Sequence, residues 1–234
     1  MERPDVQRGI GRAWRLTVEL ELGETISSAA PLDVNGEFRD VALDPNASYP
    51  LVYRTGLRLS HYNFMLTDLA FFQFSHSSPE DVRYAYYPNP YVTDRSAKDP
   101  ALIDDLRFAL EAEELNSEEY LSVLSEVETD VRAPLIRYEN APKAYSELRH
   151  PCSHFHIGHN VDNRWAVNRV LSPLAFTMLV LKHYYAPSWD ARWTELEGKL
   201  QNTLEQRLIS EKTGCHPVAP EMFSELEKRS FFFS

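Results

Sequence analysis

The strongest constraint on the fold is a pair of aromatic-rich segments separated by a short polar stretch. Residues 63–74 and 82–87 are rich in Phe and Tyr, and residues 75–80 between them contain serine, proline and charged side chains. This pattern is typical of two antiparallel strands joined by a turn. Pro88 and Pro90 follow, and they end the second strand because proline lacks a backbone donor. The sequence therefore predicts an antiparallel meander.

Strands and helices are also expected on both sides of this meander. Further strands are predicted at Leu51–Leu59, Leu135–Tyr138, His154–Gly158 and Trp165–Val170. Helices are predicted where a capping residue or proline precedes apolar residues at helical spacing. Their expected starts are the N-terminus, Asp99, Ser117, Ser172, Ser188 (running to Lys212) and Pro220.

These elements predict an α+β fold in a single domain over residues 1–234, because an antiparallel sheet carries inserted and appended helices. An acidic helical pair is inserted at residues 99–130, and C-terminal helices occupy residues 172–234. A length of 234 residues is sufficient for one well-buried core.

The negative charge of the chain is concentrated in the inserted pair. The formal net charge is -11, and residues 99–130 contain eleven acidic residues against one basic residue, Arg107. Such a surface is most often a solvated face, although it can also dock a basic partner. In residues 131–171 six Lys or Arg oppose three acidic residues, so a phosphate-bearing ligand such as RNA is admissible there.

The best candidate for chemistry is a histidine cluster, because four of the eight histidines fall within residues 150–159. Histidine exchanges protons near neutral pH, and its neutral ring is a common metal ligand. Alternate side chains of a strand share a face, so His154 and His156 should project together, with Phe155 and Ile157 turned toward a core. The plainer interpretation is that both rings simply pack at a sheet edge.

The predicted catalytic residues are His154, His156, His150, Arg137 and Glu139. One histidine can take the ribose 2′-hydroxyl proton while another protonates the leaving oxygen, without a metal or other cofactor. Either Arg137 or Arg149 can stabilise charge on the phosphate. Arg137 and Glu139 also fit an ordinary side-chain pair on one strand face.

Two alternatives to this function remain. The enzymatic one is a metal-dependent hydrolase, and the non-enzymatic one is a recognition or scaffold subunit. His154 and His156 would supply two metal ligands, and a third would come from His150, His159 or Asp162, leaving a position for water. The spacing of these residues is not a tight metal signature. A binding subunit would fit the aromatic content and the segregated acidic surface equally well.

Several motifs carry a resemblance to a known family. They are residues 60–66, 83–90 and 136–142, His150-Pro151-x-Ser153-His154, and Ser172-Pro173-Leu174. Through them most of the chain resembles the bacterial domain-of-unknown-function family 2290. The chain departs from that family after His154, where Phe-His-Ile-Gly replaces Leu-Thr-Leu-Gly, which makes His156 an addition. Genes of that family recur in bacterial defence neighbourhoods, so the resemblance implies a defence or toxin role and a neighbouring defence-system protein as a partner of residues 99–130.

A second similarity is local. Residues 137–142, Arg-Tyr-Glu-Asn-Ala-Pro, followed by the histidine-rich strand, resemble the core of small bacterial toxin proteins thought to cleave RNA. Glu139 stands where those proteins have aspartate. This resemblance implies a ribonuclease acting on RNA.

The remaining features of the sequence concern the cellular location of the protein and the kinds of functional site that the sequence does not support. No stretch approaches the roughly 20 apolar residues needed to span a bilayer, and the N-terminus lacks the order of a signal peptide, so no membrane partner is expected. With only Cys152 and Cys215, a cytoplasmic location is expected. Cys152 fits a small buried residue better than a nucleophile. The chain has no glycine-rich phosphate loop.

Overall fold

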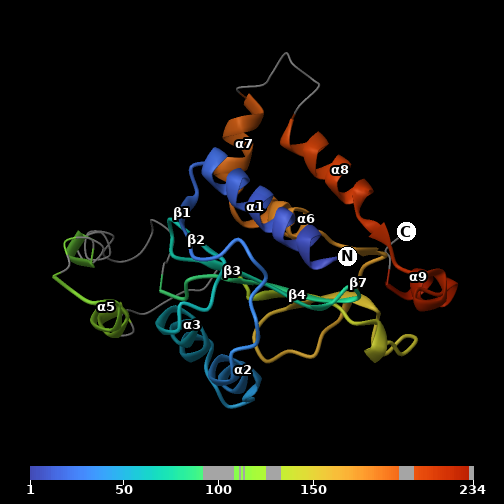
Figure 1. Cartoon of the computed structure of the whole chain (residues 1–234), viewed down its shortest axis with the longest axis horizontal. Helices are drawn as coiled ribbons and strands as arrows, with labels where there is room; N and C mark the ends of the chain where they lie inside the picture. Colours follow the sequence, from blue (N-terminus) through green and yellow to red (C-terminus); the bar gives the residue numbers. More distant parts are fainter. Residues whose placement is uncertain (92–107, 111, 113, 125–132, 195–202, 232–234) are drawn as a thin grey trace.

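The structure is a computed structural model that describes residues 1–91, 108–110, 112, 114–124, 133–194 and 203–231. Within these residues a seven-stranded sheet lies between two groups of helices (Figure 1). The strands are β1 (Gly23–Ile26), β2 (Phe64–Leu66), β3 (Phe71–Ser78), β4 (Asp81–Tyr87), β5 (Ile136–Asn140), β6 (Ser153–Ile157) and β7 (Trp165–Ala166). Neighbouring strands are all antiparallel and follow chain order across the sheet. The predicted α+β class with an antiparallel sheet is confirmed.

The central hairpin forms in the two aromatic segments. β3 and β4 pair along their length and end at Ser78 opposite Asp81. The strand predicted over residues 63–74 is divided into β2 and β3. The chain turns at Leu69, whose φ of 66° lies in the left-handed region. β3 also continues through most of the stretch expected as a turn, since two residues are enough to connect antiparallel strands.

Side-chain alternation gives the sheet two different faces. Helices α1 (Arg3–Glu19) and α6 (Pro173–Tyr184) cover one face, and α2 (Gly36–Leu43) and α3 (Tyr49–Arg58) lie on the other (Figure 1). The face toward α1 and α6 is packed with fully buried aromatics that include Phe72 and Tyr138. On the face toward α2 and α3, Phe71 stacks on Tyr87.

The strand expected at Leu51–Leu59 is wrong, because Leu51–Arg58 belong to α3 and Leu59 is its C-cap. Ser48 has the extended backbone of an N-cap, and a proline in the first turn favours helix initiation. Val52, Tyr53 and Gly56 are buried together. This is a helical spacing, whereas a strand would bury alternate residues.

The helix predicted behind Ser172 is confirmed as α6. The Oγ atom of Ser172 accepts a hydrogen bond of 3.0 Å from the backbone N–H of Ala175. The end of the chain is also helical, with a 3₁₀ turn at Pro220–Met222 followed by α9 (Glu225–Phe231). Together these elements confirm the predicted C-terminal helices.

A single helix from Ser188 to Lys212 is wrong. The structure has α7 (Ala186–Thr194) and α8 (Leu204–Gly214), and residues 195–202 lie outside the described part. Thr203 caps α8, because its Oγ1 atom accepts a hydrogen bond from the third residue of that helix. The segment therefore contains a second helix start.

The strand expected at Trp165–Val170 is divided between two sheets. β7 ends at Ala166, and β8 (Arg169–Val170) pairs with β9 (His216–Pro217) in a separate two-stranded ladder. This ladder connects the end of the sheet to the C-terminal helices.

The acidic insertion is described in part. The helix expected near Ser117 is present as α5 (Ser117–Leu124), and it contacts α3 at the end of the sheet away from β7 (Figure 1). The helix expected at Asp99 falls largely on residues 92–107, outside the described part. The side chain of Tyr120 packs α5 against the protein, because it is buried in the same cluster as Val52 and Tyr53 of α3.

Candidate functional site

The candidate site lies on β5 and β6, on the face of the sheet opposite α6. The register of the two strands places Arg137 opposite His156 and Glu139 opposite His154. Opposed residues in an antiparallel pair share a face, so all four side chains project to the same side. The intervening Tyr138 is fully buried on the other side. The strand pairing therefore assembles four polar groups over an aromatic core.

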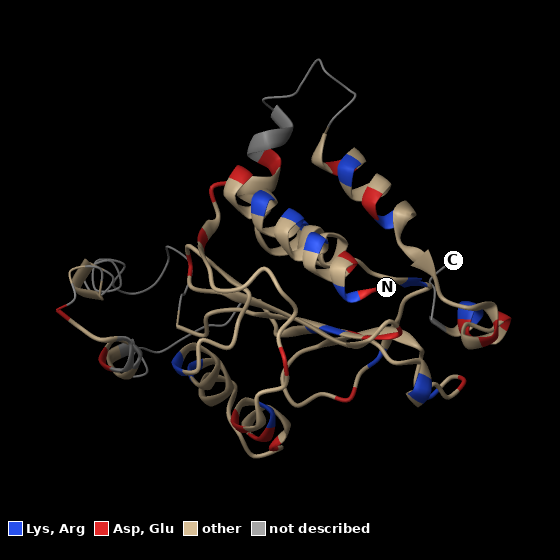
Figure 2. Cartoon of the chain, viewed as in Figure 1, with Lys and Arg blue, Asp and Glu red and all other residues tan. Residues whose placement is uncertain are grey.

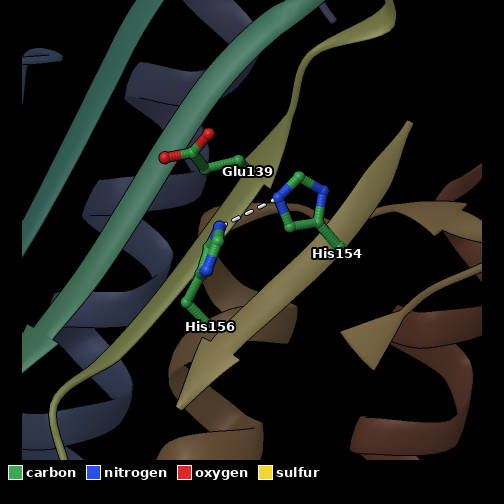
Figure 3. Close-up of side chains that lie close together, drawn as sticks. All are labelled: Glu139, His154 and His156. Carbon is green, nitrogen blue, oxygen red and sulfur yellow. Dashed lines mark hydrogen bonds between the residues drawn. The ribbon is translucent and has the colours of Figure 1, made fainter. Parts of the chain in front are cut away.

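The two histidines of β6 are in direct contact. Nε2 of His154 lies 3.0 Å from Nε2 of His156 (Figure 3). His154 is completely buried and His156 is 6% exposed. Nδ1 of His154 lies 2.8 Å from the backbone carbonyl oxygen of Pro151 and donates to it, because a carbonyl oxygen only accepts. A neutral His154 ring therefore presents the lone pair of Nε2 to the site.

Burial keeps both rings neutral at pH 7. It lowers the pKa of His154 to about 4, assisted by the nearby His156 and opposed by the Pro151 carbonyl and Glu139. The pKa of His156 is also lowered, first by burial and then by the guanidinium of Arg137. Both histidines can therefore act as lone-pair donors at neutral pH.

Two guanidinium groups lie beside the histidines. Arg137 and Arg164 both lower the pKa of His156, which places their charges near that ring. Arg164 forms an ion pair of 2.5 Å with Asp162, whose side chain is largely exposed. Nε of Arg137 and Nε of Arg164 are buried and have no hydrogen-bond partner within the described residues. The site thus retains donor capacity for an anionic ligand.

The residues predicted from the sequence lie close together, but the third metal ligand differs from the ones expected. Glu139, His154 and His156 each offer a ligand atom, and these atoms all lie within 4.8 Å of one another. The ring of His150 packs edge-on against His154 at 4.9 Å between centroids. His159 instead lies away from this group, since its Nε2 bonds the carbonyl of Ala47 at 2.7 Å. Among the described residues, Glu139 is the third ligand that this geometry offers, in place of His150, His159 or Asp162.

Two other features were missed or misjudged from the sequence. Arg164 was counted only as local charge, although it lies beside His156. Ile157 was expected in the core, but it is 37% exposed at the last position of β6. Only the tertiary arrangement reveals the position of Arg164. The register also places Arg83 of β4 opposite Glu139.

A cavity adjoins the site. It has a volume of about 220 Å³ between α2 and strands β3 to β5, and Arg137 and Glu139 line one side of it. Phe38 and Tyr87 supply aromatic lining, and Arg83 supplies a further positive charge. A ligand held here could reach the polar groups of β5.

A larger hollow of about 610 Å³ lies between α1 and α8, away from the histidines. Figure 2 shows basic residues along α1 and both signs of charge along α8. Two of its cations are already neutralised, because Arg12 pairs with Glu211 at 2.6 Å and Arg207 pairs with Glu19 at 2.7 Å. No histidine of the described residues lines this hollow, so it is not part of the candidate site.

Cys152 does not have the environment of a nucleophile. Its side chain is buried, and burial raises the pKa of its thiol to about 11. A thiol attacks as the thiolate, which is scarce at pH 7 under these conditions. The residue is part of a small apolar cluster with Val218 and Phe223.

Comparison with known proteins gives one match. No curated protein and no solved structure matches this chain, and the local similarity to RNA-cleaving toxins is not shown. No helix among the described residues is long and apolar enough to cross a membrane. The sequence matches a family over residues 26–233, which is most of its length. The chain therefore belongs to the family described as "Uncharacterized conserved protein (DUF2290)".

Proposed function

We propose that the site on β5 and β6 hydrolyses phosphodiester bonds, with RNA as the substrate. The observation that carries this proposal is the placement of two guanidinium groups, on Arg137 and Arg164, beside two neutral histidines and a carboxylate. Guanidinium groups bind phosphate oxygens, and neutral imidazoles accept protons or bind metals. The site would therefore supply both the phosphate-binding groups and the proton-accepting groups that phosphodiester cleavage uses.

The contact between the histidines assigns them to the same side of the reaction. In-line displacement places the attacking and leaving oxygens on opposite sides of phosphorus. His154 and His156 touch through Nε2, so they cannot stand on both sides at once. We therefore assign both to activation of the nucleophile. This differs from the simpler scheme in which one is the base and the other is the acid.

The ring of His150 packs against His154 with 4.9 Å between centroids, so His150 belongs to the same side of the reaction as the other two histidines. The leaving oxygen would then take its proton from solvent. Arg137 would stabilise the negative charge that develops on the phosphate. Arg149, the other candidate from the sequence, has an exposed side chain.

The cavity beside Arg137 supports a nucleotide substrate. Proteins that bind single-stranded RNA commonly hold unstacked bases on aromatic side chains. Phe38 and Tyr87 line the cavity, and Arg83 lies on the same side of the sheet as Arg137. A base in the cavity would therefore place its phosphate toward the histidines.

The proposal extends to the setting of the activity. We propose a cytoplasmic effector of a bacterial defence or toxin system. The chain belongs to the family for which the sequence motifs implied a defence or toxin role. The acidic insertion would then contact a basic surface of a neighbouring protein. Its described helix, α5, lies beside α3 and away from β7, so such a partner would not block the site (Figure 1).

The test is cleavage of end-labelled RNA by the purified chain and by His156→Ala. General acid–base groups typically contribute about 10² to 10⁴ in rate, so the variant should lose at least 10²-fold. His216→Ala is the matched control, since His216 is an exposed histidine on β9. Circular dichroism checks that both variants are folded. Absence of cleavage by the wild type, or equal cleavage by His156→Ala, would contradict the proposal.

A further inference from the structure

We infer that Glu139, His154 and His156 form a binding site for one divalent transition-metal ion, for which Zn²⁺ is the best-suited ion. The site consists of two imidazole nitrogens and one carboxylate oxygen on adjacent strands (Figure 3). Its use in catalysis rests on the proposed phosphodiester function, whereas its existence can be measured directly.

The separation of the two histidine nitrogens fits a metal. All three ligand atoms lie within 4.8 Å of one another, and the two Nε2 atoms are 3.0 Å apart. Two ligands at about 2.05 Å from a tetrahedral zinc ion are about 3.3 Å apart. A shift of a few tenths of an ångström would therefore suffice for His154 and His156. Glu139 faces His154 in the strand register and can approach from the adjacent strand.

The hydrogen bonding of His154 is that of a metal ligand. Metal-binding histidines almost always donate their second nitrogen to a carbonyl or carboxylate, which fixes the tautomer and the ring orientation. Nδ1 of His154 makes this contact with the carbonyl oxygen of Pro151 at 2.8 Å. Because the ring is completely buried, its orientation is held before any metal arrives.

The ligand set indicates both the ion and its use. Two histidines and one glutamate form a borderline set that suits zinc, and three protein ligands leave a fourth position for water. Zinc lowers the pKa of such a water to about 7, which supplies a hydroxide nucleophile. Arg137 and Arg164 would hold the phosphate next to it.

The hydrolytic step is balanced by one water molecule. Its oxygen forms a bond to phosphorus while the bond from phosphorus to the leaving oxygen breaks. One proton of the water ends on the leaving oxygen, and the other remains with the phosphate product or passes to solvent. No oxidant or reductant is needed.

The competing explanation is an ordinary hydrogen bond between the two rings. In that case one Nε2 carries a proton and donates it to the other, and no metal is held. Nδ1 of His156 is buried without a hydrogen-bond partner within the described residues in either case. Metal binding therefore has to be measured on the protein itself.

The experiment measures zinc binding independently of activity. The full chain is treated with EDTA, dialysed and titrated with Zn²⁺ by calorimetry, and bound metal is counted by mass spectrometry. We expect one equivalent for the wild type and for His216→Ala, and loss of at least tenfold in affinity for His154→Ala, His156→Gln and Glu139→Gln. Of these variants, Glu139→Gln should disturb the fold least, because Glu139 is only half-buried.

Two results would overturn the site. One is a wild type that binds no more zinc than His154→Ala and Glu139→Gln, with all proteins folded by circular dichroism. The other is equal loss in His216→Ala, which would place the zinc elsewhere. Failure of the proposed function is distinguishable: zinc bound without RNA cleavage contradicts only that function. EDTA-resistant cleavage that His154→Ala abolishes, together with absent zinc binding, contradicts only the metal site.

Discussion

The backbone carbonyl oxygen of Pro151 lies 2.8 Å from Nδ1 of His154 and accepts its proton. This contact fixes the lone pair of the neutral ring on Nε2, the nitrogen that faces His156. Pro151 thereby determines which atom of His154 is available for chemistry. The same contact opposes the loss of basicity that burial imposes on the ring.

The first prediction concerns stability at acid pH. Burial lowers the pKa of His154 in the folded state to about 4, whereas the unfolded ring titrates near 6.5. The unfolded state therefore binds the proton first, and stability present above pH 6.5 is lost as the pH falls toward 4. His156 acts in the same direction. The loss from His154 is up to about 3 kcal/mol.

The measurement is urea unfolding at pH 7.5 and pH 4.5 in the presence of EDTA. His154→Gln, which has no titrating ring, should lose less stability than the wild type between these pH values. An equal loss in both proteins would show that His154 is not held neutral by the fold.

The second prediction concerns the charge of Arg137. Its guanidinium lowers the pKa of His156, so Arg137→Gln should raise that pKa. The histidine ring signals are followed by NMR during a pH titration. Arg58→Gln is the control, because Arg58 pairs with Glu37 on the surface of α3. An unchanged titration of His156 in Arg137→Gln would place the guanidinium away from the ring.

The third prediction concerns the support beneath the site. The buried hydroxyl of Tyr138 accepts a hydrogen bond of 2.8 Å from the backbone N–H of Leu171 and lies 2.8 Å from Oγ of Ser153. Tyr138→Phe leaves the buried N–H of Leu171 without this acceptor, which costs about 1–3 kcal/mol, whereas Oγ of Ser153 keeps its hydrogen bond to the carbonyl of Arg169. Tyr84→Phe should cost less, since among the described residues its hydroxyl has only a long contact of 3.7 Å with Sδ of Met1. Chemical denaturation of both variants compares them, and equal losses would contradict this role.

The strand pattern predicted much of the site. Alternation along residues 153–157 places His154 and His156 on one face, and the same rule places Arg137 with Glu139. The register between the two strands could not be predicted, because the sequence of the connection does not determine which residues face each other. The position of Arg164 depends on that tertiary arrangement as well.

The errors in the fold have a common physical origin. Short apolar runs such as Leu51–Leu59 fit a helix or a strand, and their packing partners decide between them. The helix expected from Ser188 to Lys212 was also ambiguous, because Thr203 is an N-cap residue inside an otherwise helical pattern. Long strongly patterned elements such as α6 were predicted well, since capping and apolar spacing agree there.

The fourth prediction separates an effector from a binding subunit. An RNA-cleaving effector should slow the growth of cells that express it, alone or with its trigger, and Arg137→Ala should relieve this effect at equal protein abundance. Arg58→Ala should remain toxic. Equal growth with wild type and both variants, together with tight co-purification of a neighbouring protein, would favour a recognition subunit.

Zinc-dependent cleavage of RNA is the most direct measurement of what the β5–β6 site does. The EDTA-treated chain should be inactive on end-labelled RNA, and Zn²⁺ should restore cleavage to the wild type and to His216→Ala. Glu139→Gln, which removes one charged ligand, should remain at least 10²-fold slower at the same zinc concentration. Cleavage restored equally in Glu139→Gln, or no cleavage by the zinc-loaded wild type, would contradict a zinc-dependent phosphodiesterase at Glu139, His154 and His156.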